Sequence, residues 1–455
     1  MPGPGEFWPS FKIDCLYDLP LDWNNGCAPA YLLSNGSDVL FPLFSHFMNI
    51  LVWPTTFGAD LWSFTRYLSQ QPDTTVKVVM ENPQYFERQG VAKLYPLEAE
   101  IVRRRFHHHG WGIPGFDADV TIMDNRAPWP STSAKGFMLW HGFGWKGPND
   151  AHEMRWLHRS LRRHWGDVNE PGDRFRWQCF GEWDFKHRSE ISGVHADNCR
   201  VLGAASHDDL RVPIDRELAQ PFYPFDIINR KTVLLAPTWH YGEIFAHWGS
   251  DAVLLERLVK RIDDLGANVI IRLHDSFRFP KAYLKILEEI AARHGNVLLK
   301  FKDQSPDNFL DMQVADVLMS NFSSIANLFY ATGRPSIHIY PVRDADEAFL
   351  WRQLSVTGVK TKEIENARFI WKLSPDENGG LLAHGFEQML EQVDEALSDP
   401  NCCRQRSEQF LNTYMLGADG RNCERIFESV TALVESREET IIPAPGVTSS
   451  PAVSG

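Results

Sequence analysis

Two adjacent hydroxyls, Ser323 and Ser324, stand where a short apolar segment, 317–319, gives way to apolar residues at helical spacing over 325–329. Serines at the start of a helix commonly cap its free N–H groups. The same N–H groups, together with the helix dipole, suit a phosphate. A strand, a polar turn and a helix in that order is where open α/β folds hold anionic ligands. The pattern fits a plain helix cap as well as a phosphate site that includes Asn321 of the turn.

An imidazole, His141, directly follows a predicted strand at 137–140 and precedes Gly142 and Gly144. A histidine in this position, beside glycines that admit close approach of a ligand, is suited to proton transfer. Lys146, five residues further on, could meet a phosphate. A lone histidine is more often structural, so a catalytic and a structural role both stay open on this segment alone.

The same segment resembles a dinucleotide-binding loop, because Gly142, Gly144 and Gly147 spell GxGxxG after a strand and before a predicted helix at 151–164. NAD-binding loops also need an acidic residue about 20 positions further on, at the end of the next strand. A basic helix and a Gly/Asp/Pro loop follow here instead. NAD is therefore not expected.

The histidines of this sequence are not spaced as metal ligands. His152 and Glu153 begin a zinc-protease motif, but position 156 is Trp instead of His. The adjacent histidines 107–109 cannot all face one metal from a regular element, and no carboxylate sits at ligand spacing. We expect no metal site and no resident cofactor.

From Lys231 onward, strand-like and helix-like segments alternate regularly. Strands are predicted at 232–236, 268–273, 297–301, 317–319 and 335–340, and helices at 252–265, 280–294 and 307–311. Such alternation predicts a parallel, doubly wound sheet, whose functional residues lie at strand C-terminal ends. The polar residues at or just beyond those ends are Thr238, His240, Arg272, His274, Ser323 and Ser324.

The remaining segments are less regular. Residues 1–35 are predicted to be an irregular lead-in and 437–455 a disordered tail. Between them, strands are predicted at 76–80 and 118–123, a helix at 96–105 with Pro96 at its first position, and closing helices at 385–397 and 400–435. With 455 residues, the chain is expected to form two domains.

Composition narrows the class of protein. A net charge of −13 argues against bulk affinity for nucleic acid, so an anionic ligand needs a local site. The seven cysteines include no CxxC pair, which supports neither a zinc ribbon nor a disulfide framework. No signal peptide or stretch of about 20 apolar residues is evident, so a cytoplasmic location is expected.

Several stretches, taken together and in order, match one family. They are 139–142 (Leu-Trp-His-Gly) with Lys146, 201–210, 234–239, 270–274, 316–325 and 419–425. Together they resemble the CDP-glycerol glycerophosphotransferase family, the polymerases and primases of teichoic acid synthesis. The resemblance covers roughly residues 110–435 and is strongest from Lys231 onward.

The resemblance implies a GT-B-like architecture, with two Rossmann-like domains whose parallel sheets face across a cleft. Residues 36–228 would form the acceptor-side domain, and 229–436 the nucleotide-binding domain with its closing helices. The activity implied is transfer of glycerol phosphate from CDP-glycerol to a hydroxyl of a lipid-linked or polymeric glycan precursor, with release of CMP. The resemblance also implies a peripheral position on the inner face of the membrane, because of the acceptor.

The resemblance assigns roles to individual residues. His141 matches the catalytic histidine of the Trp-His-Gly motif, His274 the histidine of the Arg-x-His-Pro motif, and Ser323 and Ser324 the phosphate-binding pair. Several positions depart from the family: Asn321 replaces Asp, Phe322 replaces Tyr and Asp275 replaces Pro. The segment 203–208 also lacks the usual Pro-Arg and has Ala205 and Ser206 instead. These changes bear on the identity of the donor more than on the fold.

A mechanism also follows from the residues themselves. His141 would deprotonate an acceptor hydroxyl, and Arg272 and His274 would stabilise charge on the departing nucleotide. Ser323 and Ser324 would anchor the diphosphate. The remaining donor-binding candidates are Asn321, Thr238 and Lys146.

Three alternatives remain. A GT-B glycosyltransferase using a nucleotide sugar would need the same cleft. A nucleotide-sugar 2-epimerase would need carboxylates for proton chemistry at carbon, and none stands out near these motifs. A related binding or scaffold protein would need none of the catalytic residues.

Overall fold

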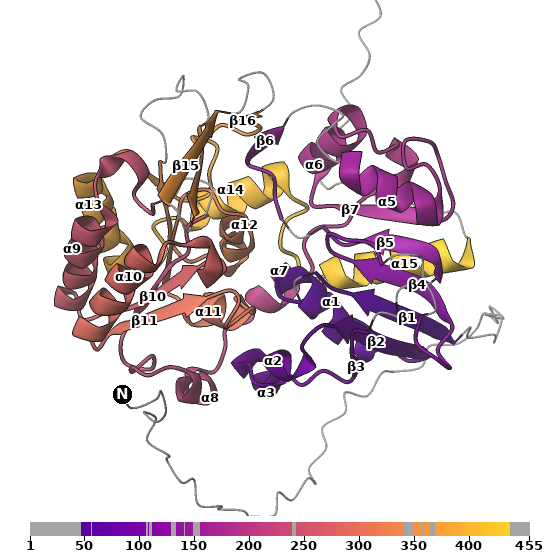
Figure 1. Ribbon diagram of the computed structural model, residues 1–455, viewed down its shortest axis with the longest axis horizontal. Helices are drawn as coiled ribbons and strands as arrows, with labels where there is room; N and C mark the ends of the chain where they lie inside the picture. Colours follow the sequence, from indigo (N-terminus) through magenta and orange to yellow (C-terminus); the bar gives the residue numbers. More distant parts are fainter. Residues whose placement is uncertain are drawn as a thin grey trace, which may run out of the picture. The chain divides into compact units, whose positions relative to one another are not determined.

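Most strands in the described part of this chain form two separate parallel sheets (Figure 1). A computed structural model describes the ranges 47–55, 57–105, 108, 112–128, 133–140, 142–148, 155–238, 243–340, 350–355, 358–363 and 369–436. In its described part the order of elements alternates between strands and helices through most of its length. The predicted α/β class with parallel sheets is therefore confirmed.

Seven parallel strands form the first sheet, in the order β3-β2-β1-β4-β5-β7-β8. They are β1 Met48–Trp53, β2 Thr74–Met80, β3 Glu100–Arg103, β4 Ala118–Met123, β5 Ser133–Met138, β7 Phe175–Cys179 and β8 Cys199–Val201. The central strands are mostly buried along their length, as expected for a parallel sheet covered on both faces.

Helices lie between these strands along the chain or, for the last two, follow β8. They are α1 Ala59–Ser69, α2 Pro83–Glu87, α3 Gly90–Leu94, α5 Arg155–Trp165, α6 Glu182–Lys186, α7 Ser206–Leu210 and α8 Arg216–Ala219. Helix α1 is the next element after β1 and packs against β2. Because α1 follows a strand of the parallel sheet, its first residues lie at the C-terminal edge of that sheet.

Six parallel strands form the second sheet, in the order β11-β10-β9-β12-β13-β17. They are β9 Thr232–Leu235, β10 Asn268–Leu273, β11 Val297–Phe301, β12 Val317–Ser320, β13 Ser336–Ile339 and β17 Leu381–Ala383. The helices that accompany them are α9 Asp251–Asp264, α10 Lys281–Arg293, α11 Phe309–Val314, α12 Ile325–Phe329, α13 Phe386–Ser398 and α14 Arg404–Tyr414.

The second sheet has a different apolar core on each of its faces. Val233 and Leu235 of β9 belong to a cluster with α9 and α10, while Leu234, between them, belongs to a larger cluster. This split follows from the two-residue period of a strand. The larger cluster also contains Ile50 and Val120 of the first sheet, so the two sheets share one continuous apolar core.

Two small antiparallel pairings complete the topology. Strand β6 Lys146–Pro148 pairs with β16 Phe369–Trp371, and β14 Leu350–Ser355 pairs with β15 Gly358–Glu363. The β6–β16 pairing joins the segment that follows His141 to a segment more than 200 residues later. This contact is too distant in sequence to be predicted from local patterns.

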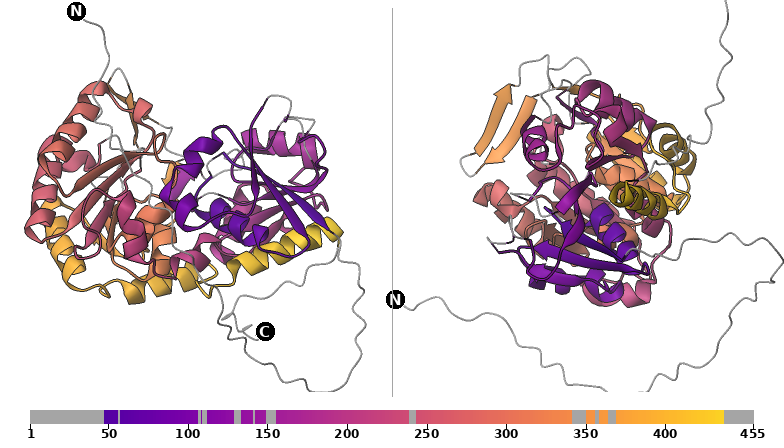
Figure 2. Two further views of the ribbon diagram at one scale, coloured as in Figure 1. Left: turned by 90° about the horizontal axis from the view of Figure 1, so that it is seen from below. Right: turned by 90° about the vertical axis from the view of Figure 1, so that its right-hand side faces the viewer.

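The last helix, α15 Asn422–Glu435, packs against the first sheet instead of the second (Figure 2). It contacts β4, β5 and β7. Helix α15 therefore returns to the sheet formed by the first half of the described residues. The domain boundaries at 35, 228 and 436 stay predictions.

One predicted element is wrong. Residues 96–105 were expected to be a helix beginning at Pro96, whereas β3 Glu100–Arg103 is an edge strand that pairs with β2. Ile101 and Val102 are β-branched, a type favoured in strands. The four residues of β3 are too few to show the alternating pattern of a strand. The helix prediction therefore depended mainly on Pro96, a residue common at the first position of helices.

Candidate functional site

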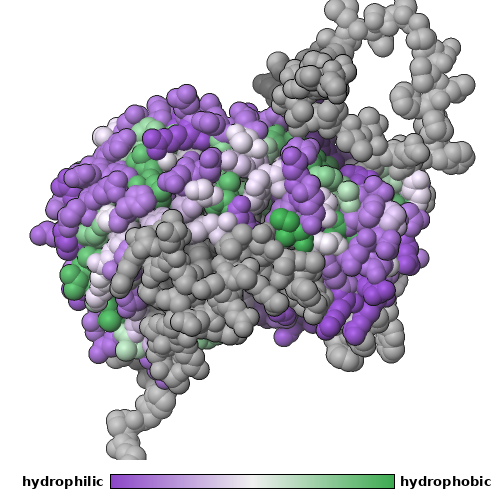
Figure 3. Space-filling model, turned by 90° about the horizontal axis from the view of Figure 1, so that it is seen from above, coloured by the Kyte–Doolittle hydropathy of each residue, from purple (hydrophilic) through white to green (hydrophobic). Residues whose placement is uncertain are grey.

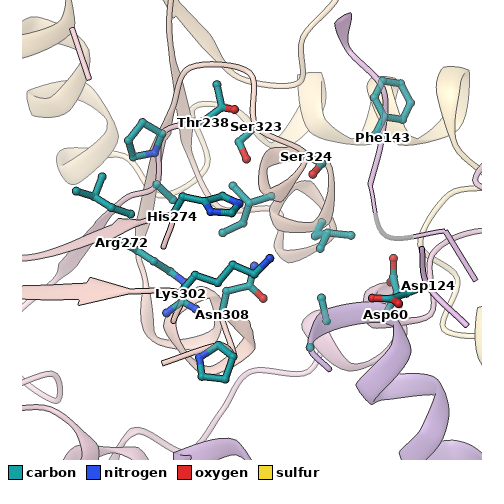
Figure 4. Close-up of a pocket in the computed structure, with 18 of the residues that line it drawn as sticks. Asp60, Asp124, Phe143, Thr238, Arg272, His274, Lys302, Asn308, Ser323 and Ser324 are labelled. Atoms are coloured by element: carbon teal, nitrogen blue, oxygen red, sulfur yellow. The ribbon is translucent and has the colours of Figure 1, made fainter. Parts of the chain in front are cut away.

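A cavity of about 500 Å³ lies where the C-terminal ends of strands from both sheets meet (Figure 4). One wall consists of residues that follow β9, β10, β11 and β12 of the second sheet. The other wall consists of residues that follow β1, β4 and β5 of the first sheet. This is the position at which open parallel sheets bind their ligands.

Five predicted site residues line the cavity from the second sheet, and their side chains are labelled in Figure 4: Thr238, Arg272, His274, Ser323 and Ser324. The sequence rule that functional residues follow strand ends therefore brings five of the predicted residues to one cavity. Their roles in binding stay predictions.

The two serines do not cap a helix. Ser324 is the N-cap residue of α12, yet its side chain makes no capping hydrogen bond. Helix α12 has only five residues, so its dipole is small compared with that of a full helix. The plain-cap interpretation is wrong, because both serines face the cavity instead.

The turn before the serines is conformationally strained. Phe322 has φ of 61°, in the left-handed region that non-glycine residues seldom adopt. Its ring is buried and packs against Trp145 and His338, with ring centroids 5.3 and 4.8 Å away. Strain of this kind persists where surrounding packing holds it, and it is frequent at ligand sites.

Asn321 lies behind the cavity wall. It is fully buried, and its Oδ1 accepts a hydrogen bond of 2.5 Å from the backbone N–H of Thr238. The Asn321 side chain thus joins the loop after β9 to the turn after β12. In this structure its described contact positions Thr238, and it is not among the residues that line the cavity.

The segment around His141 reaches the serines through Gly142. A Cβ atom placed on Gly142 would lie 2.8 Å from the Ser324 Oγ and 3.1 Å from its Cβ, which is closer than carbon atoms normally approach. Only glycine fits this position without a shift of Ser324. His141 itself lies outside the described residues, as do His240 and the side chain of Lys146.

A buried asparagine fixes α12 relative to the first part of the chain. The Oδ1 of Asn327 accepts a 2.8 Å hydrogen bond from the Trp145 indole, and its backbone oxygen lies 3.0 Å from the His207 Nε2. Burial lowers the pKa of His207 to about 4, so this ring is neutral at pH 7 and can donate from Nε2. These contacts join three segments of the predicted motif set behind Ser324.

Arg272 is held in a buried ion-pair network. Its guanidinium donates to the Asp311 carboxylate at 2.9 Å and to the Ser305 backbone oxygen at 2.5 Å. The Asp311 carboxylate also accepts from Lys300 at 2.6 Å and from the Tyr223 hydroxyl at 2.8 Å. The nearby cations hold the pKa of Asp311 below its usual value even though burial raises it. Arg272 therefore has a structural role in addition to lining the cavity.

His274 is neutral at pH 7. Burial and the neighbouring Lys302 ammonium lower its pKa to about 4, outweighing the opposing effect of Asp275. Its Nδ1 is 2.9 Å from the Asp275 backbone nitrogen and 2.7 Å from the Asp275 carboxylate. Because Asp275 engages Nδ1, a contact between His274 and a substrate would use Nε2.

Sequence reasoning missed three charged residues that line the cavity: Lys302, Asp124 and Asp60. Lys302 directly follows β11 and Asp124 directly follows β4, so the strand-end rule covers both. Asp60 lies in the first turn of α1. Its carboxylate accepts from the backbone N–H (2.8 Å) and hydroxyl (2.6 Å) of Ser206, and burial raises its pKa to about 6.

Two segments that contributed to the family resemblance hold the C-terminal helix in place. The Asp208 carboxylate accepts hydrogen bonds from the backbone N–H groups of Asn422 and Cys423, at 3.1 and 2.7 Å. The Asn422 side chain donates to the Ala204 oxygen at 2.9 Å. A Cβ on Gly203, whose φ is 77°, would overlap Asn422. The described contacts of residues 203–208 and 422–423 are therefore structural.

No group of three or more His, Cys, Asp or Glu residues that could hold a metal ion occurs within the described ranges. None of the helices in those ranges is long and apolar enough to cross a membrane. One face of the molecule is mainly hydrophilic, with apolar residues in small separate groups (Figure 3).

Comparison with known proteins places this geometry in a structural class. No protein-family model matches the sequence, and no curated protein sequence matches it. Among solved structures, the wall teichoic acid polymerase TagF aligns with a TM-score of 0.59 and 12% identity, over 86% of this chain and 90% of that one. The fold is GT-B-like.

Two other solved structures share this fold. MnaA of S. aureus, solved with UDP, aligns with a TM-score of 0.51 and 11% identity, over 85% of this chain and 97% of that one. A candidate UDP-N-acetylglucosamine 2-epimerase from Listeria monocytogenes aligns with a TM-score of 0.52 and 9% identity, over 86% and 98%. At these identities the likeness concerns the fold, and the predicted GT-B-like architecture is confirmed.

Proposed function

We propose that this protein is a GT-B-type transferase that moves glycerol phosphate, or a related polyol phosphate, from a CDP-activated donor to a hydroxyl of a lipid-linked or polymeric glycan precursor. The observation that carries the proposal is the contact between Gly142 and Ser324 at the edge of the cavity. This contact joins the residue after His141, the predicted general base, to Ser324, one of the two predicted phosphate-binding serines. TagF, whose structure was also determined after soaking with CDPG, has the same fold.

In the proposed reaction, an acceptor hydroxyl oxygen attacks the phosphorus that carries the glycerol. A new P–O bond forms, the P–O bond to CMP breaks, and CMP leaves with the bonding electron pair. His141 takes the hydroxyl proton as general base. Ser323 and Ser324 hold the diphosphate, so positioning and electrostatic stabilisation supply most of the rate enhancement.

A nucleotide-sugar 2-epimerase is the second candidate, and one observation favours it. The sequence showed no carboxylate near the site motifs, yet Asp60 and Asp124 line the cavity. Carboxylates are suited to removing a proton from carbon when their pKa is raised, and burial raises the pKa of Asp60 to about 6. Fold likeness extends to the candidate epimerase as well.

Incubation of purified protein with single donors separates these functions. CDP-glycerol, CDP-ribitol and UDP-N-acetylglucosamine would each be supplied with a hydroxyl-bearing polyol-phosphate acceptor, and CMP, UMP, UDP and epimerised sugar quantified by chromatography and mass spectrometry. Release of CMP that depends on both donor and acceptor is the expected result. An epimerised UDP-sugar without nucleotide release would favour the second candidate. No turnover and no nucleotide binding would leave a scaffold role.

A further inference from the structure

The side chain of Lys302 enters the cavity beside His274 (Figure 4). Leu273 of β10 and Phe301 of β11 are register partners in adjacent parallel strands. His274 and Lys302 are the next residues on those strands, so they leave the sheet at the same height. The Lys302 backbone N–H also donates to the Leu273 oxygen at 3.1 Å. The base of the Lys302 side chain is therefore held by the sheet itself.

The other cations described around this part of the cavity are already paired. Arg272 donates to Asp311 at 2.9 Å, Lys300 donates to Asp311 at 2.6 Å, and Arg278 donates to Asp275 at 3.0 Å. Across the described ranges, the Lys302 ammonium makes no hydrogen bond and no ion pair. Among the cations described around this part of the cavity, Lys302 is thus the one that makes no ion pair with a carboxylate.

The electrostatic setting of this ammonium favours an anion. Burial lowers the pKa of Lys302, and the positive charges of Arg278 and Arg272 lower it further. The carboxylates of Asp275 and Asp124 act in the opposite direction. A half-buried charge without a close partner is costly, and an incoming anion of opposite charge offsets that cost.

We propose that Lys302 binds the phosphates of the donor, and that Arg272, which the sequence pattern favoured for this role, instead holds the sheet through Asp311. The inference rests on the proposed function, because it takes the donor to be a nucleoside diphosphate derivative. Lys302 approaches a bound diphosphate from the β11 side of the cavity. Ser323 and Ser324 approach it from the β12 side. A lysine serves here as a point charge, which suits a phosphate of variable orientation.

Calorimetric titration of four ligands into four proteins tests this assignment. The ligands are CDP, UDP, inorganic pyrophosphate and cytidine, and the proteins are wild type, Lys302→Met, Lys302→Arg and the control Lys260→Met. Lys260 is an exposed residue of α9. We expect Lys302→Met to weaken CDP and pyrophosphate binding roughly 10- to 100-fold, as for loss of a charge-assisted hydrogen bond. Cytidine affinity should stay unchanged, and Lys302→Arg should recover part of the loss.

The same titrations can overturn the inference. Wild-type affinity of Lys302→Met for CDP and pyrophosphate would remove Lys302 from the site, and so would an equal loss of cytidine affinity. Binding of pyrophosphate but no nucleotide by the wild type, lost in Lys302→Met, would keep the anion site and reject the proposed donor class. Wild-type protein that binds none of the four ligands would reject both.

A measurement on wild-type protein covers the case in which Lys302→Met fails to fold. Reductive methylation of lysines, quantified by mass spectrometry with and without saturating CDP, compares Lys302 with Lys260 in one sample. We expect CDP to slow modification of Lys302 at least several-fold while Lys260 is unaffected. Equal modification of Lys302 in both samples would contradict the inference.

Discussion

The two walls of the cavity differ in charge. The wall from the second sheet carries hydroxyls, a neutral imidazole and two cations, from Thr238, Ser323, Ser324, His274, Lys302 and Arg272, of which Arg272 is paired with Asp311. The wall from the first sheet carries two carboxylates, Asp60 and Asp124, of which Asp124 accepts a 2.7 Å hydrogen bond from the Thr55 N–H. An anionic donor is attracted to the first of these walls and repelled by the second. The acceptor hydroxyl is then expected on the carboxylate side.

This division makes the two walls separable by experiment. A change at the hydroxyl and ammonium wall should alter nucleotide affinity, whereas a change on the acceptor side should alter turnover. A change at the contact between the two walls should alter nucleotide affinity and turnover together, or should alter stability. The four variants that follow are arranged by the size of the expected effect.

The largest effect is expected for His141→Ala. General-base catalysis typically contributes about 100- to 10,000-fold, so turnover should fall by at least roughly 100-fold while CDP affinity stays within about twofold of wild type. Steady-state kinetics and calorimetry measure the two quantities. His195→Ala, on a partly exposed residue near β8, is the matched control. Turnover close to that of wild type in His141→Ala would remove this residue from the mechanism.

Acid should weaken the fold through buried histidines. Burial lowers the pKa of His207 to about 4 and that of His338 to about 3, whereas an unfolded histidine takes up a proton near pH 6.5. Stability from these groups is complete above pH 6.5 and is lost as the pH falls toward 4. The raised pKa values of Asp60 and Asp307, both about 6, act in the opposite direction but are the smaller shifts.

His274, whose pKa is also about 4, adds to this loss. The three histidines together lower the free energy of unfolding by roughly 9 kcal/mol between pH 7 and pH 4, and the two aspartates return roughly 5, at about 1.4 kcal/mol per pKa unit. We therefore expect a net fall of roughly 4 kcal/mol. Urea titrations across this range measure it. His207→Gln should remove roughly 3 kcal/mol of that dependence, because its pKa shift is about 2.5 units from the usual value. A profile of His207→Gln identical to that of wild type would show that His207 is not buried against Asn327.

Gly142→Ala tests the joint between the walls. The added methyl group would lie 2.8 Å from the Ser324 Oγ and force that side chain to move. Small misplacements at a reaction centre can reduce rates by about 100-fold, so a roughly 10- to 100-fold loss of turnover is expected. Gly144→Ala is the matched control, since its nearest neighbour, the Lys372 Nζ, is 3.8 Å away. Equal activities of the two variants would contradict the described contact.

The smallest effect is expected for Ser324→Ala. Loss of one hydrogen bond to a phosphate should weaken CDP binding by about 2- to 12-fold, corresponding to roughly 0.5–1.5 kcal/mol. Because Ser324 makes no capping bond, thermal stability should stay within about 1 °C of wild type. A variant with unchanged CDP affinity and lowered stability would restore the helix-cap interpretation.

Local patterns predicted the second sheet better than the first. Strands β10 and β11 begin and end at the predicted residues, since a glycine ends the preceding helix and each strand contains three consecutive apolar residues. The four-residue edge strand β3 was missed because a short strand carries little periodicity. Lys302 and Asp124 were overlooked even though each directly follows a strand. The rule that selected His274 would have selected both.

Contacts between distant segments could not be predicted. The approach of Gly142 to Ser324, the Asn327 bonds to Trp145 and His207, and the pairing of β6 with β16 depend on tertiary packing. The ion pair of Arg272 could not be predicted either, because its partner Asp311 lies on a separate helix. The order of the motifs indicated the fold and the cavity, whereas the partners of each cation depend on tertiary packing.

A crystal structure of the wild-type protein soaked with CDP tests the central claim most directly. The account predicts CDP in the cavity between the two sheets, with its diphosphate within hydrogen-bond distance of the Ser324 hydroxyl and the Lys302 ammonium. CDP bound elsewhere, or bound with its phosphates against Asp60 and Asp124, would contradict it.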